Sequence, residues 1–434
     1  MFDLVKHFFI AFKQIFKGSR SYYIWVGFLS LLILIGAGTY AMQLKKGLIV
    51  TAMRDQVSWG LYLSNFTFLV GVAAAAVLLV IPAYIYDFKP IKEIVLFGEL
   101  MAITAISMCI MFIMVDLGRP ERVWHLIPFL GTMNFPASLL AWDVIVLNGY
   151  LFINLAVVLY VMYRIAHNME YSLAVVKPLV MLSIPWAVSI HTVTAFLYNG
   201  LPARPFWNAS ILAPRFLASA FSAGPALMII VFQLIRKFSK VEIENTAIQK
   251  IAELIAYAMG FNLFLLGAEM FKEFYSQTIH MAPLQYMYFG LHGHSSLVPF
   301  MWIALIFNLT AFFIFLSPRG RENLITLNLA CVLVILGVHI EKGMGLVIPG
   351  FIPGTLGEIY EYLPTNTEFI IAIGIWAFGA LLYTLMLKFV IPIYLGELRF
   401  DRGKAVGPEE MVYHGSELGG PESRIRREAD SSSS

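Results

Sequence analysis

Hydrophobic positions in this chain form long unbroken stretches, unlike the alternating strands and one-sided helices of soluble proteins. A helix needs about 20 predominantly apolar residues to cross a bilayer. Ten stretches meet that length, at approximately residues 22–42, 61–86, 94–117, 138–163, 174–200, 210–235, 251–275, 296–316, 324–344 and 367–395. The pattern predicts an all-α polytopic membrane protein with ten transmembrane helices. Their even number places both termini on one side of the membrane.

The two ends of the chain differ from this apolar middle. Residues 1–21 mix Phe, Leu and Ile with Lys at helical spacing, which is typical of an amphipathic helix at the membrane surface. A cleavable signal peptide would need a small-residue cleavage site, and none is recognised there. Residues 396–434 are polar and end in four serines. We therefore predict an interfacial helix over 1–21, a membrane domain over 22–395 and a flexible tail over 396–434.

Lys and Arg are distributed unevenly between the two sets of loops. Twenty lie in the segments on the side of the termini and nine in those on the other side. Because cytoplasmic loops carry the excess of basic residues, both termini are predicted to lie in the cytoplasm, with the protein in the cytoplasmic (inner) membrane. The outer loops are longer and rich in Gly and Pro, which favours ordered turns and a docking surface. Loops that only connect helices are the alternative.

Composition narrows the function further. Charged residues make up 13% of the chain, against about 25% in a typical soluble domain. The 30 basic and 27 acidic residues leave a net charge of +3, too balanced to indicate a nucleic-acid partner. Cys109 and Cys331 each stand alone in an apolar stretch, without a second thiol or an imidazole at ligand spacing. We expect no metal site in this chain, so an iron–sulfur centre would have to come from a partner.

Ionisable side chains inside the predicted helices gather near the outer side. Each is a candidate functional group, because a charge inside the bilayer is costly. They are Asp116, Asp143, His191, Glu269, His339 and Glu341. A transporter would place its charged site near the midplane, whereas a quinol needs proton acceptors at one face. The cluster therefore predicts a one-sided quinone site. For each residue alone, a structural role such as pairing of Glu269 with Lys272 is the alternative.

Three other hypotheses remain open from the residues alone. His191 and His339 could hold one haem b between two helices, which would make the chain a membrane cytochrome. A non-redox membrane anchor or a proton-conducting subunit is also compatible with the pattern. In the latter, Glu99, Lys177 and Glu253 could begin a proton path from the cytoplasm that ends at Glu341, across an apolar midplane.

Three short stretches carry a family resemblance: Asp116-Leu117-Gly118-Arg119-Pro120, Leu140-Ala141-Trp142-Asp143 and Ser189-Ile190-His191-Thr192-Val193. They resemble the NrfD/PsrC family, the membrane subunits of respiratory complexes, and the resemblance extends over the ten predicted helices. The runs 191–202 and 340–345 look most like the DsrP/HmcC branch, found in sulfur-metabolising prokaryotes.

The resemblance implies two four-helix bundles with flanking helices and a subunit that binds menaquinone without a metal or covalent cofactor of its own. It implies an extracytoplasmic four-cluster iron–sulfur protein and a multihaem cytochrome c as partners, as in a DsrMKJOP- or Hmc-like complex. Electrons would pass between menaquinol and the iron–sulfur partner, with protons exchanged at the outer face.

The resemblance also implies roles for particular residues. Asp116, Arg119, Asp143 and His191 match family motif positions at the quinone pocket or its entrance. The sequence departs from some relatives, which have an acidic residue shortly after the histidine where this chain reads Ala195-Phe196-Leu197-Tyr198. A second proton acceptor would then have to be another group. We expect Asp143, His191 and Asp116 to act as acid–base groups, and Arg119, Tyr198, Glu269 and His339 to help to bind the quinone.

Overall fold

A computed structural model describes residues 12–127, 130–278, 281–354, 356–401 and 404–406. Most of the predicted interfacial helix (residues 1–11) and most of the polar tail (residues 407–434) lie outside the described residues. Within the described part, ten helices are long and apolar enough to cross a membrane. The prediction of an all-α protein with ten transmembrane helices is confirmed, and the chain is a multi-pass integral membrane protein.

The long helices follow the predicted stretches closely. They are α2 (Arg20–Lys46), α3 (Leu61–Ala74), α6 (Val95–Asp116), α7 (Leu139–Ala166), α8 (Leu173–Asn199), α9 (Leu212–Phe238), α10 (Asn245–Ser276), α12 (Val298–Leu316), α14 (Leu324–Lys342) and α16 (Asn366–Tyr394). The second stretch continues from α3 through α4 (Val77–Val80) into a π-helical segment, η3 (Ile81–Ile85). Pro82 lies in that segment, where it cannot donate a backbone hydrogen bond.

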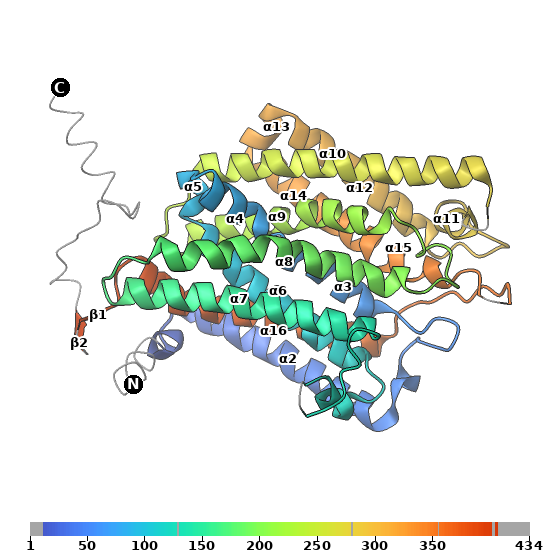
Figure 1. Cartoon of the computed structure of the whole chain (residues 1–434), viewed down its shortest axis with the longest axis horizontal. Helices are drawn as coiled ribbons and strands as arrows, with labels where there is room; N and C mark the ends of the chain where they lie inside the picture. The colour runs from blue at the N-terminus through green and yellow to red at the C-terminus, as the bar shows by residue number, and fades with distance from the viewer. Residues whose placement is uncertain (1–11, 128–129, 279–280, 355, 402–403, 407–434) are drawn as a thin grey trace.

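Short elements connect these helices. They are η1 (Lys13–Phe16), η2 (Leu48–Val50), α5 (Lys89–Lys92), η4 (Pro120–Leu126), α11 (Met281–Tyr288), α13 (Pro318–Glu322), α15 (Met344–Val347), η5 (Pro349–Phe351) and an antiparallel pair of strands, β1 (Arg399–Asp401) and β2 (Lys404–Val406). In Figure 1, the first and last described residues lie at one end of the molecule and α11 and α15 at the other. We call these the terminal end and the loop end.

Local sequence signals set several helix starts. The Ser138 side chain accepts from the Ala141 backbone N–H at 3.3 Å at the beginning of α7. Thr365 and Glu368 form a capping box at the beginning of α16, in which each side chain binds the backbone N–H of the other residue. Such caps satisfy N–H groups that have no partner inside the helix, so they fix where the helix begins.

The long helices pack as two four-helix rings and a flanking pair. In the first bundle, α3, α6, α7 and α8 contact one another in a closed ring, and in the second bundle α9, α10, α12 and α14 do the same. Helix α3 also packs on α9 and α14, which joins the bundles, while α2 and α16 pair alongside the first bundle (Figure 1). At the α2–α16 crossing, a Cβ on Gly36 would lie 2.8 Å from the Gly374 Cα, so small residues allow this close approach.

Candidate functional site

Asp143 and His191 lie in the first bundle, near the loop end. Asp143 is in the second turn of α7 and is fully buried. His191 is on α8, which packs against α7, and is 1% exposed. Eight residues separate His191 from the end of α8, which corresponds to a depth of about 12 Å. The structure thus places both predicted acid–base residues in one bundle, well inside the apolar layer.

Thr194 joins the two helices through Asp143. Its Oγ1 lies 2.9 Å from Asp143 Oδ1 and 2.8 Å from the Ile190 carbonyl oxygen. A hydroxyl has one proton to donate and can also accept. When Asp143 is ionised, Thr194 can donate to the carboxylate; when Asp143 is protonated, it can donate to Thr194 while Thr194 donates to Ile190. Asp143 can therefore gain or lose a proton without a rearrangement of its neighbours.

Several buried polar atoms of this site have no partner within the protein. They are Asp143 Oδ2 and both ring nitrogens of His191. Leaving a buried donor or acceptor unpaired costs about 1–3 kcal/mol, so such atoms are uncommon in structures and each calls for an explanation, such as a catalytic role or a bound water or ion. The His191 Nε2 faces α3 and α9, because a Cβ on Gly71 would lie 3.8 Å from Nε2 and 3.5 Å from the Ala220 Cα. These atoms are suited to a polar ligand or to protons.

Tyr198 lies two turns from His191 on α8, towards the loop end. Its hydroxyl is 2.6 Å from Thr67 Oγ1 on α3. Its ring packs edge-on against Trp59 and Trp207, with centroids 5.6 and 5.3 Å away. Tyr198 therefore lies between His191 and the loop end, and its hydroxyl already has a hydrogen-bond partner. Asp116, the last residue of α6, keeps one buried oxygen, Oδ1, without a partner.

Two other predicted quinone-binding residues have different surroundings. The Arg119 side chain is 75% exposed and pairs with Glu121 at 3.3 Å, on the surface of the loop end. His339 is half-buried, with its ring centroid 4.7 Å from that of Phe68 and 6.4 Å from that of Trp376. In this structure His339 packs against aromatic rings. No group of three or more His, Cys, Asp or Glu side chains within the described residues could hold a metal ion.

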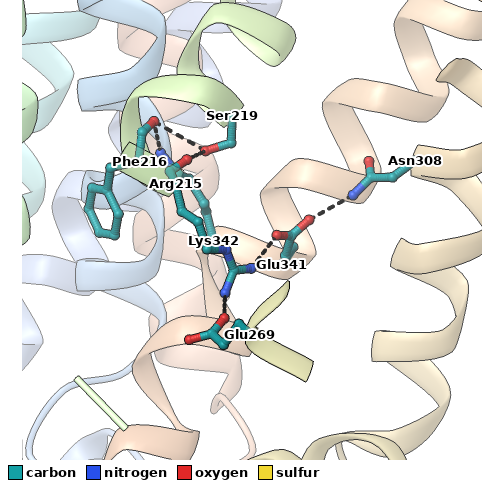
Figure 2. A network of polar contacts seen from close by, with 7 residues as sticks. All are labelled: Arg215, Phe216, Ser219, Glu269, Asn308, Glu341 and Lys342. Carbon is teal, nitrogen blue, oxygen red and sulfur yellow. Dashed lines mark hydrogen bonds and ion pairs between the residues drawn. The ribbon is translucent and has the colours of Figure 1, made fainter. Parts of the chain in front are cut away.

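Glu269 and Glu341 belong to a second polar site, in the second bundle (Figure 2). Arg215 on α9 pairs with Glu269 on α10, and its other terminal nitrogen lies 2.6 Å from Glu341 Oε1 on α14. The second oxygen of Glu341 accepts from Asn308 Nδ2 on α12 at 2.8 Å. The four helices of the bundle each contribute one member. Lys272, the alternative partner of Glu269, instead pairs with Glu273 at 3.0 Å.

Lys342 extends this site towards the first bundle. It is 5% exposed, donates to the Phe216 carbonyl on α9, and places its Nζ 4.3 Å from the centroid of the Phe216 ring. A narrow pocket adjoins it, lined by Phe206, Leu212, Arg215, Phe216, Ser219, Leu266, Leu284, Met287, Glu341, Lys342, Gly345 and Leu346. We call Arg215, Glu269, Asn308, Glu341 and Lys342 the ion network.

Sequence reasoning missed the role of Arg215 and Lys342. Both are at the edges of apolar stretches, where basic residues resemble loop cations that indicate only orientation. In the structure Arg215 lies within α9, with its side chain 13% exposed, and Lys342 ends α14. The adjacent Glu341 was a signal that Lys342 lies at a polar site. Thr194, three residues after His191, was equally visible but carries no charge.

The residues proposed for a proton path from the cytoplasm lie on different helices of the two bundles. Glu99 is buried on α6 in the first bundle, whereas Glu253 is on α10 in the second and pairs with Lys250 at 3.0 Å. Lys177 is exposed near the start of α8. Of the four residues proposed for the path, Glu341 alone belongs to the ion network. The proton path stays a prediction.

Comparison with known proteins identifies the family. The family model described as polysulphide reductase, NrfD, matches residues 49–352, which include both bundles. The chain belongs to the NrfD family. The predicted resemblance is thereby confirmed, while the DsrP/HmcC branch stays a prediction.

Three relatives of this NrfD-family chain align over nearly their whole length. A putative dimethyl sulfoxide reductase membrane subunit of Halobacterium salinarum is 26% identical over 84% of this chain and 90% of its own. A selenate reductase subunit of Mesobacillus selenatarsenatis is 23% identical over 84% of this chain and 93% of its own. An Hdr-like menaquinol oxidoreductase integral membrane subunit of Archaeoglobus fulgidus is 24% identical over 87% and 95%.

Proposed function

We propose that this chain is the quinone-reactive membrane subunit of a respiratory reductase complex. Menaquinol would react in the first bundle between Asp143 and His191, and its electrons would pass to an iron–sulfur partner at the loop end. Support comes from the relatives, among which are subunits named for menaquinol oxidation and for selenate reduction. Within a DsrMKJOP- or Hmc-like complex, the partner would be a four-cluster iron–sulfur protein that also contacts a multihaem cytochrome c.

The unpaired polar atoms of Asp143 and His191 carry this proposal. A quinol hydroxyl donates a hydrogen bond before oxidation and must lose its proton as it is oxidised. Asp143 Oδ2 and a neutral His191 nitrogen are buried acceptors without a partner in the protein. Thr194 lets Asp143 hold that proton in an unchanged position. Because both acceptors lie near the loop end, protons and electrons would leave on the same side.

Sidedness follows from the same proposal. The basic bias of the sequence supports a cytoplasmic terminal end, so the loop end would face outwards and present η4 and the exposed residues 356–358 to the partner. Asp116, which ends α6 beside that surface, would pass protons from the buried site towards water. Arg119 and His339 would contribute at the entrance of the site.

The test is menaquinol oxidation by the intact complex. Asp143→Asn and His191→Ala should each abolish menaquinol-dependent reduction of the iron–sulfur partner, while the complex still assembles. Asp87→Asn and His167→Ala, at the terminal end, are matched controls that should leave the rate unchanged. Unaltered menaquinol kinetics in both site variants would refute the proposal. A haem band in the absorption spectrum of this subunit, lost in His191→Ala, would favour a cytochrome instead.

A further inference from the structure

Lys342 occupies the junction between the two bundles. It ends α14, a helix of the second bundle that also packs on α3 of the first. Its ammonium group donates to the Phe216 carbonyl and lies over the Phe216 ring. An ammonium group has three protons to donate. A buried charge with so few partners is costly, which makes Lys342 a group whose proton can leave.

Lys342 is also close to His191. The Phe216 carbonyl points along α9 towards residue 220, one helical turn or about 5 Å further into the membrane. The His191 Nε2 faces that same Ala220, across the Gly71 position of α3. The Lys342 ammonium and the His191 ring therefore both approach the turn of α9 formed by residues 216–220. Two positive charges this close inside the apolar layer would repel one another strongly.

Lys342 completes the charge balance of the ion network. Arg215 is shared by Glu269 and Glu341, so Arg215 and Lys342 together offset two carboxylates. If His191 becomes positive while Lys342 stays positive, the region gains a net charge. If Lys342 loses its proton at that moment, the total charge is unchanged.

A route for that proton adjoins Lys342. The pocket lined by Lys342, Glu341 and Arg215 is partly open and reaches Leu284 and Met287 of α11 at the loop end. It is too narrow for a quinone ring and suits water-sized molecules.

We propose that Lys342 is a proton-release group that serves the quinone site. This inference rests on the proposed function, in which menaquinol is oxidised to menaquinone, two protons and two electrons, and the electrons pass to the iron–sulfur partner. One quinol proton moves to Asp143 and the other to His191. As His191 becomes positive, Lys342 gives a proton from its ammonium group to water in the pocket. The proton on His191 later moves to the neutral Lys342, which restores both groups.

Two substitutions with opposite expectations test this inference. Lys342→Met removes the charge, so the first turnover of menaquinol oxidation should stay within about twofold of wild type while fast proton release falls from two protons per quinol to one. Lys342→Arg keeps a charge that does not lose its proton. It should slow the first turnover at least tenfold, because His191 cannot become positive beside it. The intact complex is measured in liposomes, with a pH dye for the protons and the iron–sulfur absorbance for the electrons.

Controls separate this inference from the proposed function. Lys272→Met removes an exposed lysine at the loop end of α10 and should change neither measurement. Thermal unfolding of each variant checks that the complex is folded. A wild-type rate and wild-type proton release in Lys342→Arg would overturn the inference, as would equal slowing in both Lys342 variants, which indicates a packing role. A wild-type complex that does not oxidise menaquinol at all would instead refute the proposed function.

Discussion

The polar sites of the two bundles differ in how their titratable groups are paired. In the first bundle, Asp143 and His191 are buried with three polar atoms unpaired. In the second, Arg215 holds two carboxylates, and Asn308 completes the bonding of Glu341. The titratable groups of the first site therefore keep acceptors for a ligand, whereas the charged groups of the second are paired with one another and its unpaired buried atoms belong to the neutral amides of Asn262 and Asn308. The difference suggests that chemistry and charge compensation are divided between the bundles, with Lys342 between them.

The largest effect should follow from breaking the ion network. Arg215→Met would leave Glu269 and Glu341 buried without their shared cation. Removing one partner of a buried ion pair typically costs about 3–5 kcal/mol, since the remaining charge is uncompensated. We expect a loss of that size in the free energy of unfolding, measured by denaturant titration in detergent.

The matched control is Arg119→Met. Its ion pair with Glu121 is exposed to solvent, and such pairs contribute about 0–1 kcal/mol. Equal stability losses in the two variants would show that the ion network does not differ from a surface pair.

A smaller effect is expected at the first site, where the hydrogen bond to Asp143 positions the carboxylate. Thr194→Val removes that hydrogen bond while keeping the shape of the side chain. A lost hydrogen bond to a buried acceptor costs about 1–3 kcal/mol, which corresponds to roughly 5- to 150-fold in rate if the loss falls on the transition state. Menaquinol oxidation should slow by that factor, measured at saturating quinol.

Thr192→Val provides the comparison on the same helix. Thr192 Oγ1 donates only to the Val188 carbonyl at 2.9 Å, on a more exposed face of α8. A rate in Thr194→Val that matches that of Thr192→Val would mean that Thr194 does not position Asp143.

The smallest effect concerns the contacts of Glu361 with Ser296 and His294, which join two segments of the loop end and which we call the clasp. Glu361 accepts from the Ser296 backbone N–H at 2.9 Å and lies 3.3 Å from His294 Nδ1. Burial opposes the charge of Glu361, but hydrogen bonds from Ser296 and His294 hold its pKa below the ordinary value of 4.5. The clasp therefore stabilises the loop above pH 4.5, and this contribution is lost as the pH falls through the lowered pKa.

Glu361→Gln should remove this pH dependence and cost about 0–1 kcal/mol, because the group is partly exposed. Amide hydrogen exchange of residues 291–297 should become faster at neutral pH in the variant. Glu358→Gln, an exposed neighbour in the same segment, should leave the exchange unchanged. Identical exchange in the two variants would show that Glu361 does not hold residues 291–297 in place.

Much of the architecture was predictable because it depends on local sequence. The length of each apolar stretch set the ten transmembrane helices, and caps such as Ser138 and Thr365 set where two of them begin. Asp143 and His191 were also accessible from sequence, since a charged or titratable side chain in an apolar stretch is conspicuous. The six residues of the predicted outer-side cluster are divided in the structure: Asp143 and His191 lie in the first bundle, whereas Glu269 and Glu341 lie in the ion network of the second.

What the sequence determined by itself is the number of membrane crossings, their approximate ends, the family and the titratable residues available. Only the tertiary structure decided which of those residues meet. Arg215 binds partners 54 and 126 residues away, and Asp143 binds Thr194, 51 residues away. Hydropathy is a property summed along the chain, so it records that a helix enters the membrane but not which face it turns to a neighbour. Because of the way the helices rotate and pack, Arg215 and Lys342, which look like loop cations in the sequence, lie at the centre of the buried ion network.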